Sequence, residues 1–321
     1  MAGARVLVTP REFLDLDGEH KDILREAGYE IVANPRPRIL TEDEMAAYIT
    51  GMEAVIVGDD PMTHRVLERA LNLKIISKFG THVDNIEVDV AAAKGIPVAF
   101  TPGVTHPAVA ELTIGLMFAL LRGIPQMDRD IRSGKWSSTV GVELMGKTLG
   151  IVGLDGVGKE VAKRALALGM NVLGFDMHPD ESFAEHHGIE YVPADELLKR
   201  SDLITLHLGL TPDTKGWLSK MRVARIRQGA YLISTGRLEL LDEGAVLDAL
   251  RSQRIRAAAF DLPAEDTPFA VSLFSLENVL VTGNAGSHTE ECVRRQAVMA
   301  AENVVAVLSG HPRLAALATA G

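Results

Sequence analysis

The sequence contains a single cysteine, and this scarcity excludes an internal disulfide. Cys292 alone is consistent with a reducing compartment, and no histidine or cysteine lies beside it at the spacing of metal ligands. Long apolar runs are also missing: no segment approaches the length that spans a bilayer, and Val6–Val8 is too short for a signal peptide. We therefore expect a cytoplasmic protein with no metal site and no membrane partner.

Positive charge is scarce as well. The chain has 33 lysine and arginine residues against 43 aspartate and glutamate residues, which gives a formal net charge of −10 at pH 7. This balance argues against nucleic acid or an anionic membrane as the main partner, although a locally basic pocket can still receive an anionic substrate. With 321 residues, 47% of them hydrophobic, the chain is long enough for two domains.

Strand-like apolar segments alternate with helical segments along the chain. The predicted strands are 5–9, 29–33, 54–57, 74–78, 98–99, 171–176, 203–206, 231–233, 257–260 and 279–281, in addition to the strand that precedes Gly153. Predicted helices include 19–27, 41–49, 107–122 and 288–308, with capping boxes at Thr41–Glu44 and Ser287–Glu290. This alternation predicts an α/β fold of two doubly wound, Rossmann-like parallel-sheet domains with a cleft between them.

The most informative segment is a glycine-rich turn between a predicted strand and a predicted helix, with the sequence KTLGIVGLDGVG at 147–158. A strand, turn and helix in this order place a dinucleotide pyrophosphate on the helix N-terminus. The next predicted strand ends in Asp176, 23 residues after Gly153, near the spacing at which an acid binds the adenosine ribose hydroxyls. Because such a carboxylate repels a 2′-phosphate, we expect NAD as the cofactor in preference to NADP.

The same turn departs from the usual Gly-x-Gly-x-x-Gly spacing, because Asp155 occupies the middle glycine position and a glycine follows at Gly156. A carboxylate beside a pyrophosphate is electrostatically unfavourable unless it turns outward to solvent. Two interpretations stay open: a rotated loop that uses Gly156, or weakened dinucleotide binding.

Several further motifs occur in order along the chain. They are KFGTHVDNI at 78–86, TPGV at 101–104, AVAEL at 108–112, GKTLG at 146–150, LHLGLTP at 206–212 and STGR at 234–237. With these motifs the chain resembles the D-2-hydroxyacid dehydrogenase family, in its phosphoglycerate-dehydrogenase-like branch. The resemblance implies a discontinuous substrate domain of 1–100 plus 287–321, an NAD-binding domain of 101–286, and a homodimer formed through the NAD domain.

The resemblance also implies which side chains perform the chemistry. In the family an arginine grips the substrate carboxylate and carbonyl, a histidine is the acid/base, and a glutamate pairs with the histidine; a planar guanidinium and a titrating imidazole suit these tasks. Arg237 follows a predicted strand at the position of the substrate arginine. Glu265 and Asp266 are equal candidates for the glutamate.

The histidine position is where this chain departs most from the family. The family pattern Thr-Pro-His-Ile-Gly is here TGNAG at 282–286, so Asn284 occupies the histidine position. A neutral amide cannot deliver a proton at pH 7. His288, at the start of the last helix, and His82, in the substrate loop, are candidate substitutes, although a capping role is the more ordinary interpretation for His288. His106 is interpreted as a surface or cap residue.

By the same resemblance, the substrate loop and the cofactor site are each assigned a set of residues. The substrate carboxylate is expected at Arg237 and at the substrate loop, Gly80, Thr81 and His82. The expected cofactor contacts are Gly153, Asp155, Gly156, Val157, Gly158, Asp176, His207, Leu208, Thr211, Thr235, Gly236, Asp261, Asn284 and Gly286.

Three functions remain open at this point. The first is an NAD-dependent oxidoreductase that acts on a small anionic 2-hydroxy or 2-keto acid, phosphorylated acids included, with an altered acid/base residue. The second is an NAD-binding but weak or inactive family member that acts as a sensor or partner protein. The third is a lyase or isomerase that holds NAD as an internal redox agent.

Overall fold

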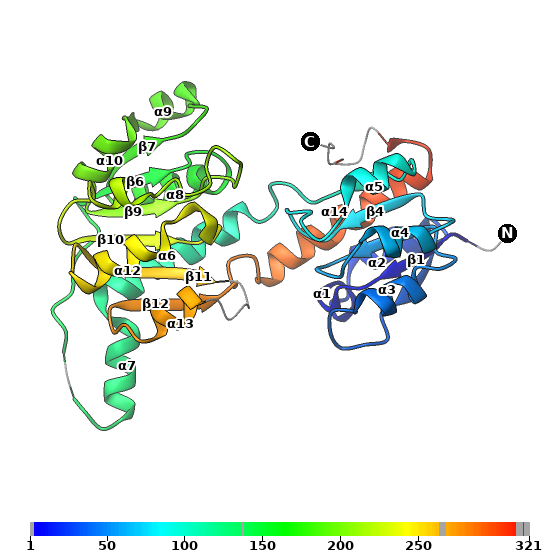
Figure 1. The fold of residues 1–321 in the computed structure, drawn as a ribbon, viewed down its shortest axis with the longest axis horizontal. Coiled ribbons are helices and arrows are strands. Elements are labelled where there is room, and N and C mark those ends of the chain that lie inside the picture. Colours follow the sequence, from blue (N-terminus) through cyan, green and yellow to red (C-terminus); the bar gives the residue numbers. More distant parts are fainter. Residues whose placement is uncertain (1–2, 137, 263–267, 313–316, 318–321) are drawn as a thin grey trace. The chain divides into compact units, whose positions relative to one another are not determined.

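The structure, a computed structural model, describes residues 3–136, 138–262, 268–312 and 317. The chain divides into two compact units, one of Met1–Thr105 with Thr289–Gly321 and one of His106–His288 (Figure 1). Each unit is built on one parallel sheet, so the predicted α/β fold with doubly wound parallel sheets is confirmed.

The first unit contains a five-stranded sheet in the order β2-β1-β3-β4-β5. The strands are β1 (Arg5–Val8), β2 (Glu30–Ala33), β3 (Ala54–Val57), β4 (Ile75–Lys78) and β5 (Val98–Ala99). Two neighbouring strands, β3 and β4, are buried along their whole length. Strands that are buried along their whole length are typical of a parallel sheet that is covered on both faces.

Helices cover both faces of this sheet. They are α1 (Arg11–Asp15), α2 (Glu19–Glu26), α3 (Glu42–Tyr48), α4 (His64–Arg69), α5 (Val88–Ala93) and α14 (Glu290–Leu308). Side chains of α3, α4 and α5 pack with Val55 and Ile76 on one face. Those of α1, α2 and α14 pack with Ala54 and Ile75 on the other face. The last helix of the chain therefore completes the core that the first helices begin (Figure 1).

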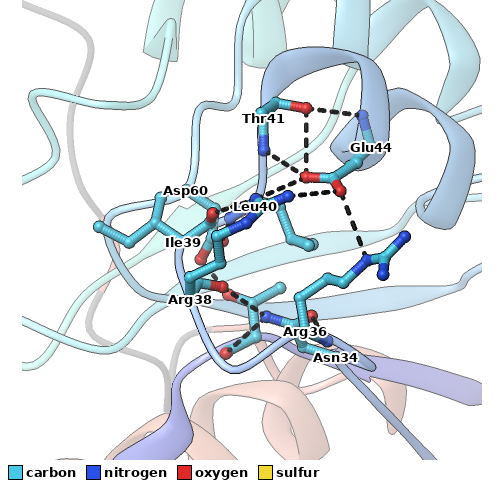
Figure 2. Close-up of polar contacts among 9 residues, drawn as sticks. Asn34, Arg36, Arg38, Ile39, Leu40, Thr41, Glu44 and Asp60 are labelled. Carbon is cyan, nitrogen blue, oxygen red and sulfur yellow. Dashed lines mark hydrogen bonds and ion pairs between the residues drawn. The ribbon is translucent and has the colours of Figure 1, made fainter.

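Side-chain hydrogen bonds hold the loop between β2 and α3, both within the loop and to Asp60, which follows β3 (Figure 2). Asn34 Nδ2 donates to the Arg38 carbonyl at 3.2 Å, and the Leu40 N–H donates to Asp60 Oδ1 at 2.7 Å. Arg38 reaches forward to Glu44, whose two carboxylate oxygens each accept a 2.8 Å bond from the guanidinium. These contacts fix the point at which α3 begins.

The second unit contains a seven-stranded sheet in the order β12-β11-β10-β9-β6-β7-β8. The strands are β6 (Thr148–Val152), β7 (Asn171–Phe175), β8 (Glu190–Tyr191), β9 (Leu203–Leu206), β10 (Ala230–Ser234), β11 (Ile255–Leu262) and β12 (Val279–Gly283). The chain runs from β6 outward to β8 and then returns to β9 on the other side of β6. In open α/β sheets this reversal is where ligands bind, beyond the carboxyl ends of the strands.

The helices of the second unit pack on both faces of its sheet, except for α7 (Ile124–Arg132), which has no buried residue. They are α6 (His106–Arg122), α7 (Ile124–Arg132), α8 (Gly156–Ala167), α9 (Glu181–His187), α10 (Ala194–Arg200), α11 (Lys220–Val223), α12 (Glu243–Arg251) and α13 (Pro268–Phe274), with a 3₁₀ turn η1 at Leu238–Leu240. Apolar side chains of α6, α8 and α9 pack together on one face, and those of α10, α11 and α12 on the other.

Of the two capping boxes predicted from the sequence, one is present in the structure and the other is not. The predicted capping box of α3 is confirmed, with the Thr41 side chain and Glu44 bonded to each other's backbone N–H. The box predicted at Ser287–Glu290 is wrong, because Thr289 caps α14 by accepting the Cys292 N–H at 3.2 Å. Residues 285–288 form a turn closed by the His288 N–H on the Ala285 carbonyl, so the helix cannot begin at Ser287.

Within the described part of the chain, no single helix is long and apolar enough to cross a membrane. The helices α6 and α7 reach the required length and apolar composition only when they are taken together, and the chain bends by 60° between them. The apolar residues of α6 lie in the core of the second unit. Among the described residues no group of three or more His, Cys, Asp or Glu side chains could hold a metal ion.

Candidate functional site

The glycine-rich turn between β6 and α8 is shaped by close backbone approaches. Gly153 has φ +93°, and a Cβ added there would lie 2.4 Å from the Leu208 nitrogen. A Cβ on Gly158 would lie 1.9 Å from the Gly153 carbonyl oxygen. Only glycine fits at these two positions, and α8 begins immediately at Gly156. The turn therefore presents the N–H groups of a helix N-terminus at the switch point of the sheet.

Asp155 is the residue before α8, and its side chain is 83% exposed. The Gly156 N–H, together with Lys159 and His106, holds the pKa of the Asp155 carboxyl below its ordinary value against the opposing effect of partial burial. Lys159 Nζ lies 3.4 Å from Asp155 and 2.8 Å from Asp180. The carboxylate thus lies at the solvent side of the turn with a cation beside it.

His106, the first residue of α6, packs its imidazole against this turn. A Cβ added to Gly156 would lie 2.9 Å from His106 Cε1, so the ring covers the backbone of the first residue of α8. Spacing along the sequence gives no sign of this contact, because 50 residues separate the two positions. Only the packing of α6 beside α8 brings them together.

The adjacent strand ends carry two further predicted cofactor residues. Asp176 directly follows β7, where the Gly153 N–H donates to the Phe175 carbonyl at 2.8 Å, and its carboxylate accepts the His178 N–H at 3.0 Å. His207 directly follows β9, and its N–H donates to the Val152 carbonyl at 2.7 Å. Both residues therefore lie beside the glycine-rich turn.

The loop after β9 is ordered by its own side chains. Burial lowers the pKa of His207 to about 3, so the ring is neutral, and its Nε2 lies 2.9 Å from Thr205 Oγ1. Leu208 is buried in the core. The Thr211 N–H donates to Thr214 Oγ1 at 2.7 Å, which closes a turn at the carboxyl end of the strand.

Arg237 lies three residues beyond the end of β10, after Thr235 and Gly236. Its guanidinium contacts Glu239, with Nη2 at 2.9 Å from Oε1 and Nε at 3.4 Å from Oε2. Thr235 Oγ1 lies 3.2 Å from Thr113 Oγ1, which ties the same loop to α6. Glu265 and Asp266, the two candidates for the family glutamate, lie outside the described residues.

Asp261, near the end of β11, holds the turn that carries Asn284. Its carboxylate accepts the Thr282 hydroxyl at 2.7 Å, the Ala285 N–H at 2.8 Å and the Gly286 N–H at 2.9 Å. Asn284 at the top of this turn has φ +53°, a left-handed conformation that asparagine tolerates better than most residues.

His288 lies against the same turn. Its Nδ1 is 2.7 Å from the Asn284 carbonyl oxygen, and because a carbonyl only accepts, the Nδ1–H donates. The sequence predicted an imidazole near the cap of the last helix, and the structure puts that imidazole beside the backbone of Asn284.

Comparison with known proteins decides the family. Residues 114–286, more than half of the chain, match the model of the D-isomer specific 2-hydroxyacid dehydrogenase NAD binding domain. The chain belongs to the D-isomer specific 2-hydroxyacid dehydrogenase family. The predicted resemblance is therefore confirmed at the level of the family and of its NAD-binding domain.

Individual relatives of this family member cover most of its length. It is 39% identical to the D-3-phosphoglycerate dehydrogenase of Methanocaldococcus jannaschii over 94% of this chain and 58% of that protein. It is 36% identical to the hydroxypyruvate reductase of Thermotoga maritima over 83% of this chain and 88% of that protein. The chain thus spans little more than half the length of the phosphoglycerate dehydrogenases it matches.

Solved structures agree with the fold of the family. A crystal structure of a protein from Thermus thermophilus superposes with a TM-score of 0.86 at 34% identity, covering 95% of this chain and 97% of that one. The apo-structure of Escherichia coli D-lactate dehydrogenase gives the same TM-score at 27% identity, with the same coverage of both chains.

In this 2-hydroxyacid dehydrogenase family member the predicted substrate loop belongs to the first unit. Gly80 follows β4 and is bonded to Thr101 in both directions, at 2.9 to 3.1 Å. Thr81 Oγ1 lies 3.0 Å from His82 Nδ1. Lys78, at the end of β4, has a buried ammonium that donates to the Gly58 carbonyl at 2.7 Å and to Asp59 at 2.9 Å. The loop therefore starts from a rigid, hydrogen-bonded base.

Proposed function

We propose that this chain is an NAD-dependent oxidoreductase that transfers a hydride between the nicotinamide and C2 of a small anionic 2-hydroxy or 2-keto acid, with an altered acid/base residue. The observation that supports it is the arrangement at three neighbouring strands of the second sheet. Arg237 follows β10, Asp261 lies near the end of β11, and the turn with Asn284 follows β12.

The residues at the glycine-rich turn fit a dinucleotide. Gly153 and Gly158 leave no room for a Cβ, the N-terminus of α8 offers N–H groups for a pyrophosphate, and Asp176 offers a carboxylate for the ribose hydroxyls. NAD would supply the hydride acceptor at this edge of the sheet. Asp155 brings a negative charge to the position of the middle glycine, and Lys159 beside it offsets that charge.

Arg237 is the proposed anchor of the substrate carboxylate, because a guanidinium binds a planar carboxylate through two parallel hydrogen bonds. Asn284 occupies the position of the family histidine, and its neutral amide cannot act as a general acid or base at pH 7. We infer that His288 exchanges the proton, since its ring is hydrogen-bonded to the Asn284 backbone and imidazole is the side chain that titrates near neutral pH.

The unit His106–His288 is the proposed NAD-binding unit, and the loop Gly80–His82 is the proposed second binding element for the substrate carboxylate. The homodimer through the NAD domain stays a prediction. It is supported by exposed apolar side chains on α7 and on the segment that follows, namely Ile124, Ile131, Trp136 and Val140.

The deciding experiment is the pH profile of kcat/KM with NADH and glyoxylate or hydroxypyruvate. We expect a step in the range where imidazole titrates, lost in His288→Gln and retained in the matched control His64→Gln, an exposed histidine on α4. A step lost in His82→Gln instead would assign the proton to the substrate loop. A wild-type profile without any step would remove both histidines from the mechanism.

A second experiment uses the variant Asn284→His, which restores the family residue. Histidine, like asparagine, tolerates the left-handed conformation of this turn. Turnover of simple 2-keto acids should rise about tenfold or more if the remaining machinery is intact. Bound NAD with no turnover in either protein would favour the alternative function, an NAD-binding sensor or partner protein. That alternative is supported by the same asparagine.

A further inference from the structure

The proposed substrate arginine already has a carboxylate beside it. Glu239, two residues further along the chain, accepts hydrogen bonds from Arg237 Nη2 at 2.9 Å and Nε at 3.4 Å. The side chains are 37% and 43% exposed, so the pair lies at the surface of the second unit. The hydrogen bond from Arg237 lowers the pKa of the Glu239 carboxyl, and Glu239 is therefore ionised at neutral pH.

The backbone holds Glu239 at this point. It lies in the turn η1 between Leu238 and Leu240, which are 8% and 1% exposed. The loop after β9 is bonded to the same turn, with the Gly216 N–H on the Glu239 carbonyl at 2.7 Å and the Leu218 N–H on the Leu240 carbonyl at 2.8 Å. A substrate can displace the carboxylate from one edge of the guanidinium, but the turn keeps the negative charge close to Arg237.

We propose that Glu239 is a specificity-determining residue that restricts the substrate to small 2-keto or 2-hydroxy monocarboxylates and disfavours acids that carry a phosphate or a second carboxylate. The proposal rests on the proposed function, in which Arg237 binds the substrate carboxylate. One guanidinium shared with Glu239 attracts an incoming anion less strongly than an unpaired one. Each further negative charge on the ligand is repelled by Glu239.

The size of this effect follows from Coulomb's law. At roughly 8 Å, the separation across a three-carbon acid, a unit charge repels another by an amount equivalent to about three- to tenfold in affinity in a partly hydrated site. Salt weakens the interaction over a distance of about 8–10 Å. An acid with an extra phosphate should therefore be discriminated against most strongly at low ionic strength.

The test is the ratio of kcat/KM for hydroxypyruvate to kcat/KM for its 3-phosphorylated form, measured with NADH in wild type and Glu239→Gln. The wild type should prefer hydroxypyruvate. Glu239→Gln should raise kcat/KM for the phosphorylated acid by about three- to tenfold, mainly through KM, and raise that for hydroxypyruvate by less. Glu239→Ala serves as the second variant if the glutamine protein does not fold.

The matched control is Glu243→Gln, which makes the same charge change at the start of α12, where the side chain is exposed. It should leave the ratio unchanged. A wild type that prefers the phosphorylated acid, a ratio that does not move in either Glu239 variant, or an equal shift in Glu243→Gln overturns the proposal.

Failure of the proposed function gives a different pattern. If Arg237→Ala leaves turnover of both acids unchanged, Arg237 is not the substrate anchor and the proposed function fails. If Arg237→Ala abolishes turnover of both acids while Glu239→Gln leaves their ratio unchanged, only the inference about Glu239 fails.

If the wild type turns over neither acid, the same ratio is read from calorimetric Kd values for glycerate and 3-phosphoglycerate with NAD present. The same shifts are then expected and the same results overturn the proposal.

Discussion

At the scale of single residues, Asp261 near the end of β11 holds the neighbouring turn 282–286 through its carboxylate. Both of its oxygens accept hydrogen bonds from the turn 282–286, and only 7% of the residue is exposed. That turn sets the left-handed backbone of Asn284 and the carbonyl to which His288 donates. A carboxylate that was predicted to contact the cofactor therefore also supports the turn to which His288, the proposed proton-transfer residue, is hydrogen-bonded.

This support predicts the effect of Asp261→Asn. An amide offers one acceptor oxygen, and its NH₂ group would face either the Ala285 or the Gly286 N–H, leaving a buried donor unpaired. We expect a loss of about 1–3 kcal/mol in the free energy of unfolding, measured by urea denaturation. Thr282→Val, which removes one hydrogen bond and keeps the carboxylate, should cost about 1 kcal/mol. Equal stabilities of Asp261→Asn and wild type would show that the turn does not depend on the hydrogen bonds to Asp261.

At the scale of elements, helix starts depend on more than the local pattern of residues. Thr41–Glu44 and Ser287–Glu290 have the same polar spacing, but only the first forms a capping box. Glu44 is also held by Arg38 from the loop between β2 and α3 (Figure 2). Before α14, the backbone N–H groups of Ala285 and Gly286 are already bonded to Asp261, which moves the helix start to Glu290.

The contacts of Glu44 at the start of α3 should make the stability of the folded state depend on pH in the acidic range. Arg38 and the Thr41 N–H lower the pKa of Glu44 from its ordinary value near 4.5 to about 2. The folded state therefore gains from the ionised carboxylate above pH 4.5, and this gain disappears as the pH falls from 4.5 to 2. Glu44→Gln should lower Tm at pH 7, with a difference from wild type that shrinks across that window. Glu26→Gln, an exposed acid on α2, should change Tm little; a pH-independent deficit for Glu44→Gln would contradict the assignment.

At the scale of the whole molecule, each unit contains a histidine whose pKa is lowered by its surroundings. Burial lowers the pKa of His20 in the first unit and lowers that of His207 in the second unit to about 3. When the chain unfolds, both rings regain an ordinary pKa of about 6.5. Below that pH the unfolded chain binds protons that the folded chain does not, so stability falls as the pH falls.

His207→Asn should remove part of this pH dependence. Between about pH 6 and pH 4 one histidine contributes a slope approaching 1.4 kcal/mol per pH unit to the free energy of unfolding. Urea denaturation followed by the fluorescence of Trp217, 4% exposed in the core of the second unit, would measure that slope. We expect a shallower slope in His207→Asn and an unchanged slope in His64→Gln. An unchanged slope in His207→Asn would mean that the folded protein protonates this ring.

Features that depend on residues close together in the chain could be predicted from the sequence alone. Alternating strands and helices predicted the two parallel sheets, the glycines of 153–158 predicted a turn that excludes side chains, and Thr41–Glu44 predicted a helix start. These features follow from periodicity, backbone sterics and hydrogen bonds within one turn, which act over a few residues. The family motifs carried the prediction further, to Arg237 and to Asn284.

The partners that those residues contact become clear only in the folded chain. His106 meets Gly156 because α6 packs beside α8, Asp261 holds the turn with Asn284 because β11 and β12 are neighbours, and α14 joins the first sheet from the far end of the chain. Even the contact of Arg237 with Glu239, only two residues away, depends on the buried leucines and on the loop from β9 that shape the turn η1. Hydrogen bonds and packing between distant segments decide these contacts, and spacing along one chain does not encode them.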